Sequence, residues 1–80
     1  MQENDRINHV LAENVTRLRQ EQQLTKSSLA LMSGISRLTL NKVEKGASNV
    51  RLSNLQKMAD ALCVDPADLL DTSSNSQRDL

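Results

Sequence analysis

The absence of aromatic side chains is the feature that most constrains this chain. Its 80 residues contain no Phe, Tyr or Trp, whereas Leu occurs 13 times. A chain of this length has room for one hydrophobic core at most. Because that core must be built from Leu, Val, Ile, Ala and Met, packed helices are favoured over a β-sandwich. The missing rings also argue against modules that stack single-stranded bases on aromatic side chains.

The charges balance overall but are unevenly distributed. The chain has 10 basic and 10 acidic residues. Residues 26–51 hold five basic side chains and one acidic side chain, a net charge of +4, while residues 1–25 carry −1 and residues 52–80 carry −3. A neutral protein with such a basic middle segment can present a positive face to a polyanion.

Several classes of protein are disfavoured. One Cys (Cys63) excludes an intramolecular disulfide, and one Cys with one His (His9) disfavours a zinc site. The sequence has no glycine-rich phosphate loop and no pairing of a nucleophile with a base, so we expect no enzyme activity, cofactor or metal. It also has no run of 18 apolar residues and no signal peptide, so we expect a cytoplasmic protein without membrane contact. We expect His9 on a solvent-facing surface and Cys63 as a small buried hydrophobe.

Apolar residues at helical spacing predict an all-α, five-helix domain over residues 1–71, with a disordered polar tail over 72–80. The predicted helices span residues 5–22, 26–32, 36–46, 52–62 and 66–71. Their inward faces are expected to include Met32 on the second helix and Leu52, Leu55, Met58, Ala59 and Leu62 on the fourth.

Capping residues mark the predicted helix ends. Thr25 and Ser36 stand where an N-cap is needed, and Asp65 followed by Pro66 is a typical helix start. Gly34 and Gly46 stand where helices end. The turn from Ser33 to Ser36 is too short for antiparallel packing, so the second and third helices must cross at a steep angle.

Residues 24–46, which read LTKSSLALMSGISRLTLNKVEKG, resemble the helix-turn-helix of the phage repressor and Cro type, the XRE-like family. The matching pieces are the Leu-Thr opening, Leu-Ala in the second helix, Gly-Ile-Ser at the turn and Val-Glu-Lys-Gly at the end. The resemblance extends over residues 8–71. It implies a repressor-like DNA-binding domain whose third helix enters the major groove, which is wide enough for one α-helix.

The resemblance assigns roles to individual residues. The expected base-reading residues on the third helix are Arg37, Leu38, Thr39, Asn41 and Lys42. The expected phosphate-binding residues are Lys26, Lys45, Ser48, Asn49 and Arg51. Arg37 has the geometry to fork onto a guanine, and Leu38 can contact a thymine methyl.

The resemblance further implies an ion pair between Arg19, late in the first helix, and Glu44, late in the third. Glu44 is the only acid in the basic segment, and pairing it inward removes its repulsion of phosphate. The chain departs from the family at Ser27-Ser28, where acids are common, and at Cys63, where Gly or Asn often ends the fourth helix.

The implied function is sequence-specific binding of double-stranded DNA by a transcription regulator that acts by occupancy of an operator. One recognition helix reads only about 4–6 base pairs, so a homodimer on two half-sites is expected. The expected dimer surface comprises Val64, Leu69 and Leu70, with Leu62 as an additional contact.

Three alternatives remain open at this point. An antitoxin would combine the same DNA-binding fold with a toxin partner that orders the tail Thr72–Leu80, and a toxin reading frame beside this one would identify it. A protein-interaction module on a degenerate helix-turn-helix would not need the +4 charge of residues 26–51. An enzyme or metal protein would need ligands or a nucleophile that the sequence lacks.

Overall fold

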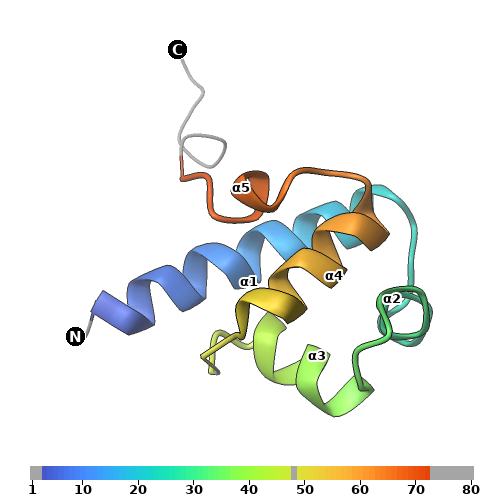
Figure 1. Ribbon diagram of the computed structural model, residues 1–80, viewed down its shortest axis with the longest axis horizontal. Helices are drawn as coiled ribbons and strands as arrows, with labels where there is room; N and C mark the ends of the chain where they lie inside the picture. The colour runs from blue at the N-terminus through green and yellow to red at the C-terminus, as the bar shows by residue number, and fades with distance from the viewer. Residues whose placement is uncertain (1–2, 48, 73–80) are drawn as a thin grey trace.

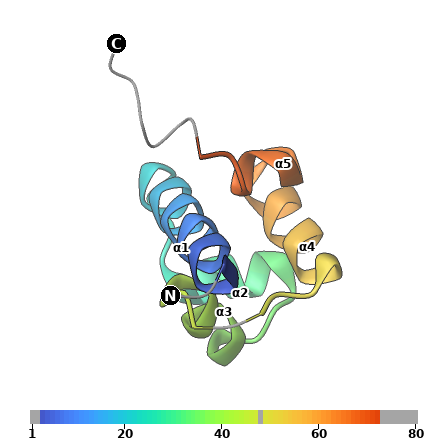
Figure 2. The ribbon, with the colours of Figure 1, turned by 90° about the vertical axis from the view of Figure 1, so that its left-hand side faces the viewer.

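Five helices pack around one core in the computed structural model, which describes residues 3–47 and 49–72. They are α1 (Glu3–Glu21), α2 (Lys26–Ser33), α3 (Arg37–Glu44), α4 (Leu52–Leu62) and α5 (Pro66–Leu69). The described residues contain no strand. α1 crosses the whole molecule, α4 and α5 pack along it, and α2 and α3 close the side opposite α5 (Figures 1 and 2). The predicted all-α, five-helix class is confirmed, although α5 ends at Leu69 instead of residue 71.

The predicted N-caps begin the two helices of the helix-turn-helix, α2 and α3. The Thr25 hydroxyl accepts a hydrogen bond from the backbone N–H of Ser28 at 3.0 Å, which satisfies a free donor at the start of α2. The Ser36 hydroxyl does the same for the N–H of Thr39 at 3.1 Å, at the start of α3. Between them Gly34 adopts a left-handed backbone with φ of 75°. A turn of three residues therefore separates α2 from α3.

The same type of C-terminal cap ends α1, α2, α3 and α4. After each helix one residue adopts a left-handed backbone, and the next N–H bonds to the carbonyl five residues back, at 3.0–3.2 Å. The left-handed residues are Gln23 (φ 60°), Gly34 (φ 75°), Gly46 (φ 70°) and Cys63 (φ 61°). Two of the four are not glycine, so Gln23 and Cys63 adopt a conformation that L-residues normally avoid.

The core consists of aliphatic side chains drawn from all five helices. Fully buried large side chains are Val15, Leu29, Leu40, Val43, Met58, Leu62 and Leu69. Burying a Leu, Val or Met side chain contributes roughly 1.5–3 kcal/mol. A small domain without aromatics thus obtains its stability from many aliphatic contacts.

Three side chains lie elsewhere than predicted. Met32 is 53% exposed, because α2 buries the stripe formed by Leu29, Ala30 and Ser33, and Met32 projects from the other side of the helix. Leu52 is 80% exposed, because it lies at the start of α4, where it lines a groove on the surface and is not covered by the core. Cys63 is exposed, since the left-handed turn at this position directs its side chain outward.

Candidate nucleic-acid interface

α3 has one buried face and one face open to solvent. Leu40 and Val43 are 0% and 1% exposed and anchor the helix to the core. On the opposite side Arg37, Leu38 and Lys42 are exposed, with Leu38 at 66%. In both views α3 lies at the edge of the molecule remote from α5 (Figures 1 and 2). The helix therefore presents three of the expected base-reading side chains on a free edge.

The two other expected base readers are less accessible. Thr39 and Asn41 are half-buried. The Thr39 hydroxyl also accepts a hydrogen bond from the Ser36 hydroxyl at 2.9 Å, within the N-terminal cap of α3. Thr39 thus helps to form the start of the helix as well as lying near its outer face.

Basic side chains of the segment 26–51 carry no ion pair with any described residue. These side chains are Lys26, Arg37, Lys42, Lys45 and Arg51. Four of them are exposed and Lys26 is half-buried, while Asn49 in the same segment is exposed. Ser48, the remaining expected phosphate ligand, lies outside the described residues. The positive charge of this segment is consequently available to an external polyanion.

The only acid of the basic segment is turned inward. Arg19 Nε donates to Glu44 Oε2 at 2.9 Å, and Arg19 Nη2 donates to Glu44 Oε1 at 3.2 Å. The Thr16 hydroxyl donates to the same Oε1 at 3.1 Å, and Arg19 Nη1 donates to the carbonyl of Leu24 at 2.9 Å. The side chains of Arg19 and Glu44 are only 12% and 4% exposed. The expected ion pair is therefore present, and it joins the end of α3 to α1 and to the segment before α2.

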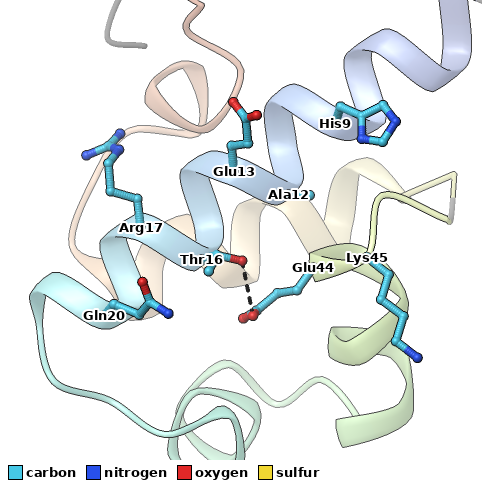
Figure 3. A pocket seen from close by; sticks show the side chains of 8 residues that line it. All are labelled: His9, Ala12, Glu13, Thr16, Arg17, Gln20, Glu44 and Lys45. Carbon is cyan, nitrogen blue, oxygen red and sulfur yellow. Dashed lines mark hydrogen bonds between the residues drawn. The ribbon is translucent and has the colours of Figure 1, made fainter.

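A groove of about 480 Å³ runs beside this ion pair, between α1 and the end of α3 (Figure 3). Thr16 lies at its centre and bonds to Glu44, whereas the Lys45 side chain points away from it. Its lining mixes acidic, basic and amide groups, and the described residues hold no cluster of His, Cys, Asp and Glu that could bind a metal.

The loop after α3 rests against α1. Asn8 Nδ2 lies 3.5 Å from Asn49 Oδ1. A Cβ placed on Gly46 would lie 3.0 Å from His9 Nδ1, so the space between this backbone and the imidazole ring is too tight for a side chain to fit easily. His9 is itself exposed, as expected. The expected phosphate-binding loop thus lies against the first half of α1.

The residues of the expected dimer surface differ widely in exposure. Leu69 is 0% exposed because α5 packs it against α1 and α4, so it has no surface to offer a partner, and Leu62 is likewise 0% exposed. Val64 is half-buried and packs against the core. Leu70, at 37% exposure, is the accessible member of the predicted set.

An apolar groove of about 170 Å³ extends from Leu70 across the N-terminal half of α1 and the start of α4. Its lining residues are Ile7, Asn8, Leu11, Asn49, Val50, Leu52, Leu55 and Leu70. Ile7 and Leu52 are 48% and 80% exposed. Sequence reasoning missed this groove because its walls come from three separate segments.

A buried polar residue also escaped the sequence analysis. Asn14 is 0% exposed, and its Nδ2 donates to the carbonyls of Leu69 at 2.8 Å and Asp71 at 3.2 Å. Arg17 Nη2 donates to its Oδ1 at 3.2 Å. The signal was visible, since Asn14 interrupts the apolar stripe of Leu11, Val15 and Leu18 at a position where a hydrophobic residue is expected. Asn14 fixes the end of α5 to α1.

These features define a helix-turn-helix domain in which the outer face of α3 exposes Arg37, Leu38 and Lys42. The family described as Helix-turn-helix matches residues 15–69. The chain therefore belongs to the helix-turn-helix family, and it is of the phage repressor and Cro type, a class of DNA-binding transcription regulators. The described residues include no helix long and apolar enough to cross a membrane.

Two similar proteins are named as controllers, and a third as a transcription factor. Control protein C.BamHI from Bacillus amyloliquefaciens is 38% identical over 48 residues, which are 60% of this chain and 59% of that protein. The crystal structure of the restriction-modification controller protein C.AhdI from Aeromonas hydrophila is 34% identical with a TM-score of 0.75, covering 78% of this chain and 94% of that one. A hypothetical transcription factor from Neisseria, NHTF, is 31% identical with a TM-score of 0.82, covering 94% of this chain and 86% of that one.

Proposed function

We propose that the protein is a transcription regulator of the restriction-modification controller type, which binds a two-fold symmetric operator as a homodimer and acts by occupying it. The observation that carries this proposal is the outward face of α3. Arg37, Leu38 and Lys42 are exposed there, while the opposite face is buried and the ion pair of Glu44 fixes the helix end. The likeness to two controller proteins supports the type of regulator.

In this proposal α3 lies in the major groove and its exposed side chains contact base edges. The Arg37 guanidinium donates two hydrogen bonds to a guanine, Leu38 contacts a thymine methyl, and Lys42 reads a second position one turn later. Thr39 and Asn41 contact bases or sugars at the flank. Phosphates are contacted by Lys26, Lys45, Ser48, Asn49 and Arg51, whose roles are positioning and electrostatic attraction.

Dimer formation is proposed through the apolar groove instead of through Leu69. Ile7, Leu52 and Leu70 are large apolar side chains that are exposed around one groove, and apolar side chains gathered in this way favour an interaction site. The same groove includes Asn49, beside Arg51 in the loop proposed to contact phosphate. The proposed interface therefore lies next to that loop.

Binding measurements on specific and random duplexes test the assignment of the reading face. Arg37→Ala or Lys42→Ala should weaken binding to the operator by roughly 5- to 150-fold, the equivalent of about 1–3 kcal/mol, with a much smaller effect on random DNA. Lys26→Ala should weaken both complexes alike and reduce the salt dependence of binding. Lys57→Ala is the matched control, because Lys57 is an exposed cation on α4 outside the basic segment.

An unchanged ratio of specific to random affinity in Arg37→Ala would show that another face reads the bases.

The dimer interface is tested separately by Leu52→Lys, which should give a folded monomer in sedimentation with sharply reduced operator affinity. Leu31→Lys is its control, since Leu31 is 84% exposed on α2 and lies outside the groove. A Leu52→Lys protein that remains dimeric would rule out the groove.

A further inference from the structure

The two serines at the start of α2 have different hydrogen-bond partners. The Ser28 hydroxyl accepts from the Thr25 hydroxyl at 3.0 Å and belongs to the cap of the helix. The Ser27 hydroxyl instead accepts from Arg37 Nη1 at 2.7 Å. This bond joins the second residue of α2 to the first residue of α3 across the turn of the helix-turn-helix.

The bond holds a side chain that would otherwise be free to rotate. Arg37 is exposed and has no ion pair with the described residues. An exposed arginine normally samples many rotamers, and much of that freedom is lost when it binds a base. The hydrogen bond that Arg37 Nη1 donates to the Ser27 hydroxyl at 2.7 Å restricts the guanidinium before DNA arrives.

The restriction leaves the guanidinium able to bind. Arginine has five N–H donors, and only one of them is directed at Ser27. The edge formed by Nε and Nη2 still offers two parallel donors, which match the O6 and N7 acceptors of guanine. The Ser27 hydroxyl keeps its own proton, which it can donate to a water.

We propose that Ser27 is a positioning residue that determines specificity, because it holds the Arg37 guanidinium ready to read one base pair. This inference rests on the proposed role of Arg37 in base reading. It also accounts for the absence of an acid at the start of α2. A carboxylate at position 27 would form an ion pair with Arg37 and draw it away from the DNA, whereas a neutral hydroxyl orients it without neutralising its charge.

The test compares binding to the operator, to an operator changed at the base pair read by Arg37, and to random duplex. Ser27→Ala should lower the preference for the correct base pair by roughly 3- to 10-fold, the effect of one hydrogen bond, with unchanged affinity for random DNA. Ser27→Thr keeps the hydroxyl and should restore the preference. Ser27→Glu should lower it further than Ser27→Ala does. The melting temperature should stay within error in the Ala and Thr variants, because Ser27 is exposed.

Ser53→Ala is the matched control, since Ser53 is an exposed serine near the start of α4. In the background of Arg37→Ala, adding Ser27→Ala should cause no further loss. If Arg37→Ala abolishes the preference and Ser27→Ala leaves it intact, the positioning role is wrong and the proposed function stands. If Arg37→Ala itself leaves the preference intact, the assigned reading face is wrong. Equal weakening of all three duplexes by Ser27→Ala would also overturn the positioning role, because it would indicate a phosphate contact alone.

Discussion

Replacing Glu44 by Ala should destabilise the domain more than removal of any exposed charge. The substitution deletes both acceptors of Arg19 Nε and Nη2 and the acceptor of Thr16. The Arg19 side chain is only 12% exposed, so its charge would remain largely buried without a counter-ion. Breaking a buried pair from one side typically costs about 3–5 kcal/mol. Because Arg19 keeps its bond to the Leu24 carbonyl, we expect about 2–4 kcal/mol here.

That loss is a large part of the available stability. A domain of 80 residues has a free energy of unfolding of about 4–12 kcal/mol. For domains of this size 1 kcal/mol corresponds to about 4–8 °C, so the melting temperature should fall by about 8–30 °C. Glu44→Gln keeps the shape and one acceptor oxygen, and its effect should be smaller.

Urea denaturation followed by circular dichroism measures this effect, with Glu21→Ala as the matched control. Glu21 pairs with Arg17 at 3.3 Å, but these side chains are 58% and 38% exposed, so the control should lose less than about 1 kcal/mol. The Glu44 effect should persist in 1 M salt, because burial limits screening. A Glu44→Ala protein within about 0.5 kcal/mol of the parent would refute the buried ion pair as the support of α3.

Three further predictions test the local geometry by thermal unfolding. Gly46→Ala should lower stability by more than Gly34→Ala does. Both positions have positive φ, but only at Gly46 would the new Cβ lie 3.0 Å from the His9 ring. Equal losses of stability would contradict that contact. Cys63→Gly should raise stability by roughly 1 kcal/mol, because Cys63 has φ of 61°, and a decrease would show that this strain is absent. Asn14→Leu should lower stability by about 2–4 kcal/mol, since two carbonyls at the end of α5 lose their donor, and a neutral result would mean that water replaces it.

Features governed by local chemistry are predictable from the sequence. Helix starts depend on a hydroxyl or carboxylate beside free N–H groups, which is why the residue types at Thr25 and Ser36 are enough to identify both as caps. Helix ends require a left-handed residue, which Gly34 and Gly46 supply. Cys63 departs from the family pattern at such an end, but its exposure depends on the direction of the turn.

Features that depend on the meeting of distant segments are not predictable in this way. Leu69 and Leu70 are adjacent and chemically identical, yet 0% and 37% exposed, and only the docking of α5 distinguishes them. The groove around Leu52 requires the start of α4 to lie beside Ile7 and Leu70. A helical-wheel pattern gives the orientation of a side chain around its own helix, but it does not show where the neighbouring helices end.

The same limit applies within the proposed DNA-reading site. The type and order of residues in α3 predict an outward face, and Arg37, Leu38 and Lys42 are exposed there. Arg37 donates to Ser27 rather than to Ser28 because of the way α2 and α3 cross. A sequence pattern does not fix that crossing closely enough to distinguish two adjacent residues.

Selection of binding sites from a pool of random duplexes tests the central claim most directly. If α3 of each protomer reads one half-site, repeated selection should enrich a two-fold symmetric sequence with half-site centres about 10 base pairs apart. Selection with Arg37→Ala should lose the preference at one base pair in each half-site and retain the rest. A pool that remains random after selection, or a single asymmetric site that Arg37→Ala selects equally well, would contradict the reading of DNA by α3 in a dimer.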